Sequence, residues 1–192
     1  MVELFYPSDT VPFLPLKEAF SERHAGEILP VCDASGQVNA CASRSYCHSP
    51  ARPLHPVVHL HILRRDGTLY LQKRSLTKDF LPGLWDTAVG GHVTYGETVM
   101  EALYREASEE LGLSDFAPVS IDSYVWETER ERELVNVFAI VGAYEPKPDG
   151  DEVSEGRWWS FQEIEKCLSD SLFTPNFESE YLRVRKALEA LL

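Results

Sequence analysis

Short apolar runs broken by turn residues dominate the first half of the chain. The run that begins at Ile28 is followed by turn-forming residues 33–36 and by a second run from Val38, which predicts a hairpin. A second hairpin is predicted where Val57–Leu63 and Leu69–Lys73 flank an Asp-Gly pair, because Asp-Gly between two β-prone runs favours a tight turn. This part of the chain is therefore expected to form a sheet.

One later segment has a helical pattern instead. Residues 98–111 contain no Gly or Pro, are rich in Ala, Leu and Glu, and end before Gly112, a common helix terminator. At about 100° per residue, the apolar residues of this helix form one stripe. Glu110 lies inside that stripe, Glu106 borders it, and Glu109 lies further round. A solvated acidic face would lie opposite the stripe, so partial burial of carboxylates is predicted here.

The rest of the chain alternates strands, loops and helices. Strands are predicted at 121–126, 135–141 and 157–160, loops at 81–85 and 146–155, and helices at 161–168 and 178–192. A mixed β-sheet between helices, an α+β fold of the α/β/α sandwich type, fits this order. Residues 1–27, with a helix-like stretch at 17–24, are expected to be an N-terminal extension, and residues 28–192 to be the folded domain.

Length and charge narrow the classes of protein. With 192 residues, 44% hydrophobic and 26% charged, the chain can bury one core. Its formal net charge of -13 repels a phosphate backbone, so nucleic-acid binding is not expected. Apolar runs are too short to span a membrane, and residues 1–16 lack the pattern of a signal peptide, so a cytoplasmic protein is expected. The four cysteines are irregularly spaced, which predicts reduced thiols.

Acidic crowding on the predicted helix requires an explanation. Carboxylates three or four residues apart repel one another, and partial burial raises their pKa values unless a positive charge compensates. Mg2+ would compensate, because it prefers oxygen ligands and is usually shared between carboxylates and substrate phosphates. The alternative is a surface helix with ion pairs from Glu101 to Arg105 and from Arg105 to Glu109.

The spacing of Gly, Glu and Arg residues over positions 91–112 favours a metal site over surface ion pairs. Five residues separate Gly91 from Glu97, seven more lead to Arg105-Glu106, and Glu109-Glu110 and Gly112 follow. At every defined position this resembles the Nudix box, G-x5-E-x7-R-E-U-x-E-E-x-G-U with U apolar, and so many fixed positions make a chance match remote. The resemblance implies that residues 28–192 form a Nudix hydrolase domain, with a mixed sheet between helices, that cleaves a diphosphate linkage.

The resemblance also assigns roles within the box. Glu97 and Arg105 are implied to hold the loop against the helix and thereby to orient the metal ligands. The implied cofactor is Mg2+ or Mn2+. The implied ligands are the carboxylates of Glu106, Glu109 and Glu110, with the carbonyl of Gly91 as a further one.

The implied chemistry is attack by water without a covalent intermediate. A diphosphate is anionic, so its oxygens must be neutralised and the water positioned, and a bound metal can do both. A carboxylate acting as general base would complete the site. That base would come from the box itself, as Glu109, or from a later acidic loop, where Glu152 and Glu155 are candidates. A merely solvated loop is the alternative for the last two.

The residues before the box indicate one particular branch of the Nudix superfamily. Residues 72–75, 81–85 and 91–92 are similar to the branch of the superfamily that includes isopentenyl diphosphate isomerase. In that isomerase the positions that match Arg74 and Lys78 contact the diphosphate, which suits cations lining a phosphate site. Its metal is held by three histidines and two glutamates, and the matching residues, which form a candidate second metal site, are His48, His55, His92, Glu131 and Glu133.

The isomerase resemblance fails at one position. The isomerase needs a catalytic Cys two residues before the histidine that matches His92, and here that residue is Gly90, which cannot transfer a proton. Conversely, the isomerase has a degraded Nudix box and this chain has an intact one. The favoured function is therefore a metal-dependent hydrolase that cleaves a phosphoanhydride in a nucleoside diphosphate linked to another group. The alternatives are an isomerase-like enzyme and a non-catalytic nucleotide sensor.

Several further points stay open on the sequence alone. His24, His59 and His61 are expected to be packed or surface residues rather than ligands. Trp85, Trp126 and Tyr95 could stack on a base, although buried core aromatics are commoner. The partner is expected to be a small diphosphate substrate, whose identity the sequence does not give. A homodimer is a general expectation for soluble proteins and is not inferred from this chain.

Overall fold

The computed structural model describes residues 26–78 and 80–192, so the helix-like stretch at 17–24, and His24 with it, lies outside the described residues. The chain forms two compact units whose segments alternate along the sequence. Within the described residues, the first unit comprises 26–58, 91–103 and 123–136. The second comprises 59–78, 80–90, 104–122 and 137–192. No helix among the described residues is long and apolar enough to cross a membrane.

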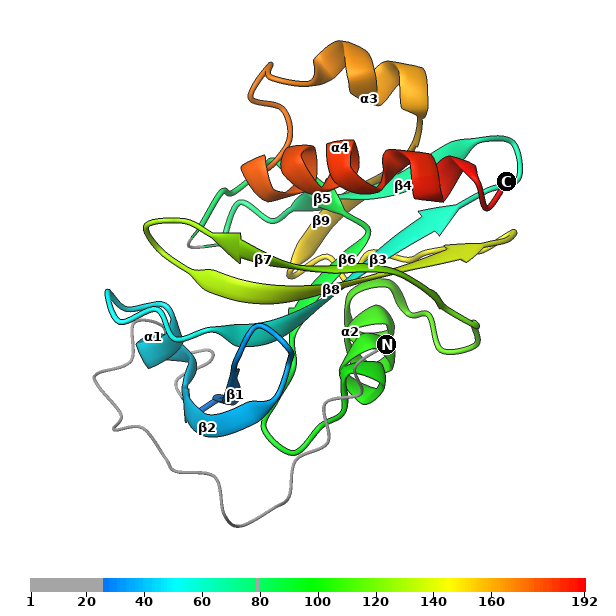
Figure 1. Cartoon of the computed structure of the whole chain (residues 1–192). Helices are drawn as coiled ribbons and strands as arrows, with labels where there is room; N and C mark the ends of the chain where they lie inside the picture. The colour runs from blue at the N-terminus through cyan, green and yellow to red at the C-terminus, as the bar shows by residue number, and fades with distance from the viewer. Residues whose placement is uncertain (1–25, 79) are drawn as a thin grey trace. The chain divides into compact units, whose positions relative to one another are not determined.

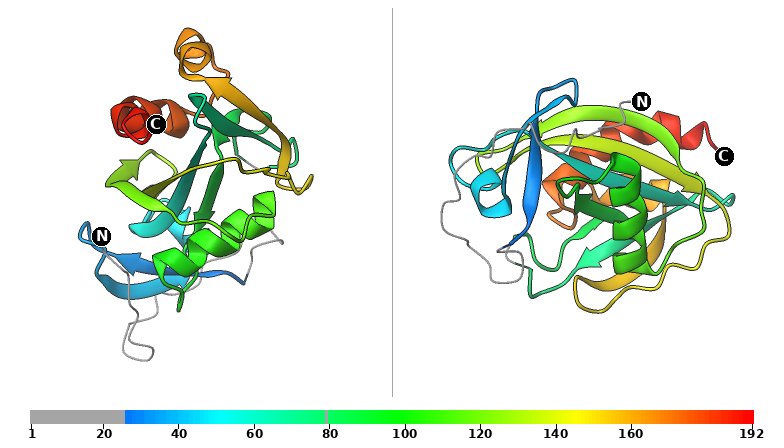
Figure 2. Two further views of the ribbon diagram at one scale, coloured as in Figure 1. Left: turned by 90° about the vertical axis from the view of Figure 1, so that its right-hand side faces the viewer. Right: turned by 90° about the horizontal axis from the view of Figure 1, so that it is seen from below.

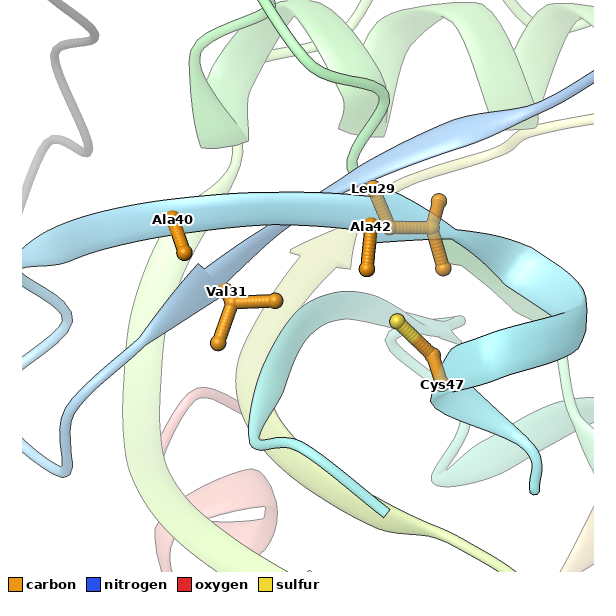
Figure 3. Close-up of a cluster of buried hydrophobic side chains, with 5 residues drawn as sticks. All are labelled: Leu29, Val31, Ala40, Ala42 and Cys47. Atoms are coloured by element: carbon orange, nitrogen blue, oxygen red, sulfur yellow. The ribbon is translucent and has the colours of Figure 1, made fainter. Parts of the chain in front are cut away.

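The first unit contains the hairpin predicted at its start. Strands β1 (Ile28–Cys32) and β2 (Val38–Ser43) pair antiparallel, which confirms the prediction. A four-residue helix, α1 (Arg44–Cys47), follows directly and was not predicted; its N-cap is Ser43, whose hydroxyl accepts the backbone N–H of Tyr46. The hairpin and α1 pack a small apolar cluster, drawn in Figure 3, of Leu29, Val31, Ala40, Ala42 and Cys47.

The second unit is organised around β4 (Thr68–Arg74). The last residues of β3 (His55–Leu63) and the short β5 (Trp85–Thr87) pair with successive parts of β4, and β9 (Val153–Ser160) pairs along its whole length. The predicted second hairpin is confirmed. The last strand starts at Val153, not at 157 as predicted, so Glu155 lies in a strand rather than in a loop.

The complete strand order follows from these pairings. The seven-stranded sheet has the order β5-β4-β3-β8-β7, with β6 pairing with β3 and β9 with β4. The strands not yet bounded are β6 (Val89–His92), β7 (Val119–Glu127) and β8 (Arg132–Val141). Strands were predicted near β7 and β8, whereas β5 and β6 were missed because they are only three and four residues long.

The helices agree with their predictions apart from their ends. Helix α2 (Val99–Leu111) ends before Gly112, whose φ of 64° suits glycine. Helix α3 (Phe161–Cys167) follows β9 directly, as Figure 2 shows. Helix α4 (Pro175–Glu189), which lies beside β5 in Figure 1, starts three residues earlier than predicted. Pro175 lies in the first turn of this helix, where a proline loses no helical hydrogen bond.

Candidate functional site

The glutamates of the box helix differ in how far their side chains are buried. Glu110 is buried, 6% exposed, and its Oε2 accepts the side-chain N–H of Gln72 at 3.2 Å and the backbone N–H of Gly90 at 3.3 Å. The predicted burial of this carboxylate is confirmed. The side chain of Glu106 is 14% exposed and that of Glu109 is 62% exposed. The three carboxylates therefore run from the interior of the second unit to solvent.

The pKa of Glu110 is raised well above its usual value of 4.5. Burial is the main cause, and the charge of Glu106 adds to it, as does that of Glu152, while Lys78 and the Gly90 amide act in the opposite direction. Ionised Glu110 thus lies in an electrostatically unfavourable environment that one ammonium does not neutralise. We call the residues Glu106, Glu110, Glu152 and Lys78 the box cluster.

The other predicted site residues of the second unit each lie close to an oppositely charged side chain. Arg105 Nη1 contacts Glu106 at 2.8 Å and Glu109 at 3.2 Å, so it holds both carboxylates. The ammonium of Lys78 is ion-paired with Glu152. Arg74 donates to the carbonyl of Phe80 at 2.9 Å and lies 3.5 Å from Asp86, and Glu155 is half exposed, 3.6 Å from Lys73.

Two predicted box residues belong to the first unit. Glu97 accepts the backbone N–H of Thr94 at 2.9 Å, so its carboxylate fixes the turn that precedes α2. Gly91 lies in β6. The structure therefore gives Glu97 a role in local loop conformation.

Also in the first unit, three histidines converge. One ring nitrogen of each of His48, His55 and His92 lies within 4.8 Å of the others, and Nε2 of His48 is 3.1 Å from Nε2 of His92. The predicted glutamates are adjacent. Glu133 Oε1 lies 3.9 Å from Nε2 of both His55 and His92, and Glu131 lies 3.8 Å from Nδ1 of His48. We call these three histidines the three-histidine cluster.

The donor atoms of the three-histidine cluster suit a divalent metal. Burial, together with the charges of His55, Arg44 and Arg130, lowers the pKa of His48 to about 3. Burial also lowers the pKa of His55 to about 4, so both rings are neutral near pH 7, the form that binds metal. Nδ1 of His55 donates to the carbonyl of Pro53 at 3.0 Å, which leaves its Nε2 with a lone pair. That Nε2 is buried and has no hydrogen-bond partner among the described residues.

Comparison with known proteins now identifies the family. The NUDIX domain model matches residues 53–177. The chain belongs to the NUDIX family. The α+β fold with its mixed sheet and helices, predicted from the sequence, is confirmed by solved NUDIX-type structures. A Methanosarcina mazei MutT protein matches with a TM-score of 0.60 and 25% identity, covering 70% of this chain and 95% of that one. A Deinococcus radiodurans structure matches with a TM-score of 0.72 and 22% identity, covering 82% and 99%.

The isomerase-like branch of the NUDIX family is confirmed by curated relatives. The isopentenyl-diphosphate Delta-isomerase of Leifsonia xyli is 31% identical over 155 residues, which are 75% of this chain and 80% of that protein. Other relatives with the same printed name, such as that of Kocuria rhizophila, match at similar identity. This NUDIX protein is therefore similar in sequence to isomerases, although it carries Gly90 and an intact box.

The three-histidine cluster of this NUDIX protein yields a first prediction. Replacing Glu133 by Gln is expected to weaken binding of Mn2+ or Zn2+ by roughly 10- to 100-fold, the range typical of carboxylates that support a metal site. Glu129→Gln is the matched control, because Glu129 is an exposed acid between β7 and β8, four residues before the buried Glu133 of β8. Calorimetric titration of the purified protein measures both affinities, and equal affinities in the two variants would remove Glu133 from the site.

The sequence analysis of this NUDIX protein did not identify the buried pairing of Glu180 with two histidines. His59 and His61 were expected to be packed or surface residues; both are buried, and both bind the carboxylate of Glu180 at 2.8 Å. Glu180 lies 121 and 119 residues further along the chain, so no local pattern could pair it with them. Alternation of His with apolar residues in β3 was the only signal of the sheet face that they share.

Proposed function

We propose that this protein is a divalent-metal-dependent hydrolase that cleaves a phosphoanhydride bond in a nucleoside diphosphate linked to another group. The observation that carries the proposal is Glu110. It is a buried carboxylate with further carboxylates around it, in a box whose spacing is intact. Such an arrangement is unfavourable in the protein alone and becomes favourable when a cation binds. A pure binding module would not need all of these carboxylates.

The metal site of the proposed hydrolase is made by the box. Glu106, Glu109 and Glu110, which all lie in the second unit, would hold Mg2+ or Mn2+. When bound, the metal neutralises phosphate charge and lowers the pKa of a coordinated water. Arg105 keeps Glu106 and Glu109 in place through its contacts with both carboxylates. Glu97 maintains the turn that leads into the helix.

Substrate binding and proton transfer fall to residues outside the helix. Lys78 and Arg74 bind the diphosphate, as cations that reach phosphate oxygens. Lys78 is paired with Glu152 in this structure, so a phosphate that takes over Lys78 releases the carboxylate of Glu152. The general base is Glu109, Glu152 or Glu155. Glu152 is supported by its position close to Glu110, where its charge helps to raise the pKa of that carboxyl.

A second candidate function is an isopentenyl diphosphate isomerase-like reaction. The three-histidine cluster and the printed names of the curated relatives favour it. Gly90 counts against it, because it stands where the isomerase has its catalytic cysteine. A non-catalytic nucleotide sensor is the third candidate. The three candidates differ in product, since only the hydrolase releases phosphate or a nucleoside monophosphate.

A product assay separates the three candidates. Purified protein is incubated with a panel of nucleoside diphosphate and triphosphate derivatives and with isopentenyl diphosphate, with Mg2+ or Mn2+ present or chelated. Metal-dependent release of phosphate or nucleoside monophosphate is the expected result. Formation of dimethylallyl diphosphate would favour the isomerase. Ligand binding without any turnover would favour the sensor.

A further inference from the structure

Tyr70 of β4 lies on the same face of the sheet as the buried carboxylate of the box. It precedes Gln72 by two residues in the strand, so the two side chains point to one face. On that face the side-chain N–H of Gln72 donates to Glu110 at 3.2 Å. All three residues belong to the second unit. Tyr70 is therefore a neighbour of the group that orients the innermost glutamate.

The phenol of Tyr70 fills the space that a side chain on β9 would otherwise take. Gly156 pairs with Gln72 across the two strands, and a Cβ on Gly156 would lie 1.6 Å from Oη of Tyr70. The φ of Gly156 is not positive, so its backbone does not require glycine, and glycine is needed there for space. Cβ atoms of paired residues are about 4.5–5.5 Å apart, which places Oη of Tyr70 roughly 3–7 Å from Cβ of Gln72.

Packing explains the ring of Tyr70 but not its hydroxyl. An aromatic ring over a strand glycine stabilises a sheet, and the ring also meets that of Trp158 edge to face at 5.2 Å. Phenylalanine would make both contacts. The hydroxyl has no hydrogen-bond partner among the described residues, and it is not one of the fully buried atoms that lack a partner, so solvent reaches it. Its O–H is therefore available to a ligand.

The hydroxyl stays protonated throughout the physiological pH range. Tyr70 is only 3% exposed, and burial raises its pKa to about 12. A neutral phenol can donate to an anionic oxygen, and such O–H···O⁻ hydrogen bonds are short and strong. In the proposed reaction, the anionic oxygens that come from outside the chain are those of the diphosphate substrate.

We propose that Tyr70 is a substrate-binding residue whose hydroxyl donates a hydrogen bond to a phosphate oxygen of the diphosphate; this inference rests on the proposed function. Arg74 and Lys78 supply positive charge to the same group, whereas Tyr70 supplies a neutral, directional donor from the sheet. Gly156 leaves the room that the phenol needs in this position, so the two residues act as a pair.

Tyr70→Phe tests this contact because it removes the hydroxyl alone and keeps the ring over Gly156. With the diphosphate that the product assay selects, KM is expected to rise by roughly 10- to 100-fold, the range for a hydrogen bond to a charged group, with kcat nearly unchanged. The melting temperature should not fall, because no internal hydrogen bond is lost. A native KM in this variant would overturn the inference.

Tyr181→Phe is the matched control. Tyr181 is a fully buried tyrosine of α4, and its hydroxyl donates inside the protein, to the carbonyl of Phe161. Its loss should leave KM unchanged. An equal rise in KM in the two variants would overturn the inference, because it would mean that removal of any buried hydroxyl disturbs the substrate site.

Binding of imidodiphosphate, a diphosphate analogue that resists hydrolysis, gives a measurement without turnover. Calorimetric titration in the presence of Mg2+ is expected to show an affinity roughly 10-fold or more lower for Tyr70→Phe than for the native protein. Equal affinities would overturn the inference and leave the proposed function intact. Absence of metal-dependent hydrolysis by the native protein would instead overturn the proposed function, so the two failures are distinguishable.

Discussion

Replacing Glu110 by Gln is expected to abolish metal-dependent hydrolysis while leaving the protein folded. The loss in kcat should exceed the roughly 10- to 100-fold cost of removing a group that merely orients a metal ligand. The reason is geometric: Glu110 is the innermost carboxylate of the box, and Gln72 and the Gly90 amide fix its orientation. Steady-state kinetics over a range of Mg2+ concentrations provide the measurement.

Although Glu110→Gln should abolish activity, it should make the metal-free protein more stable. The pKa of Glu110 in the folded protein lies above that of an unfolded chain, so ionisation of this carboxyl at neutral pH favours unfolding, and protonation as the pH falls through the folded pKa removes that penalty. Glu110→Gln removes it at all pH values. Without metal, the variant is therefore expected to melt at a higher temperature than the native protein.

Glu101→Gln is the matched control for both measurements. Glu101 is exposed on the same helix, and its carboxylate binds the backbone and side chain of Thr98, which glutamine can also do. It should change neither kcat nor melting temperature. A Glu110→Gln protein that hydrolyses like the native protein, or that fails to fold in the absence of metal, would contradict the assignment of Glu110 as a ligand held in a costly environment.

The sequence predicted the box helix well because one physical pattern determined it. Burial of Glu110 followed from its place in the apolar stripe of a 3.6-residue period, and the end of α2 followed from Gly112. The positions of β5 and β6 could not be predicted in the same way. Strands of three or four residues carry too little alternation to stand out from a loop, and their place in the sheet depends on β4 and β3.

The three-histidine cluster shows a second limit of what the sequence could predict. His48, His55 and His92 were grouped only through resemblance to a family, because no local period connects α1, β3 and β6. What the structure adds is chemical: burial keeps His48 and His55 neutral, and the carbonyl of Pro53 selects the tautomer of His55. The pairing of Glu180 with His59 and His61 lacked even a resemblance, so only the fold could supply it.

Glu110 and Glu180 are both buried in the second unit, but their carboxylates differ in the groups that compensate their charge. Among the described residues Glu110 has no imidazole partner, and its pKa is raised; in the proposed function a cation would compensate its charge. For Glu180, burial alone would raise the pKa, but the charge and hydrogen bond of His59 and those of His61 outweigh it and hold the pKa far below its usual value. In the proposed function a metal ion compensates the charge of Glu110, whereas the histidines of the protein itself compensate that of Glu180.

Replacing Glu180 by Gln should therefore destabilise the protein, in contrast to Glu110→Gln. Removing one partner of a buried charged cluster leaves the others uncompensated, and the expected loss in the free energy of unfolding is about 3 kcal/mol. Because the folded pKa of Glu180 is depressed, its stabilisation is present above the usual carboxyl pKa of 4.5 and is lost progressively as the pH falls below that value.

Urea denaturation of the native protein and the variant, at neutral pH and in acid, measures this effect. The difference between them should shrink as the pH falls below 4.5, because acid removes from the native protein what the substitution removes from the variant. Glu189→Gln, at the exposed end of the same helix, is the control, and its surface pair with Arg185 should matter little. A loss for Glu180→Gln no larger than that of the control would contradict a stabilising role of this buried carboxylate.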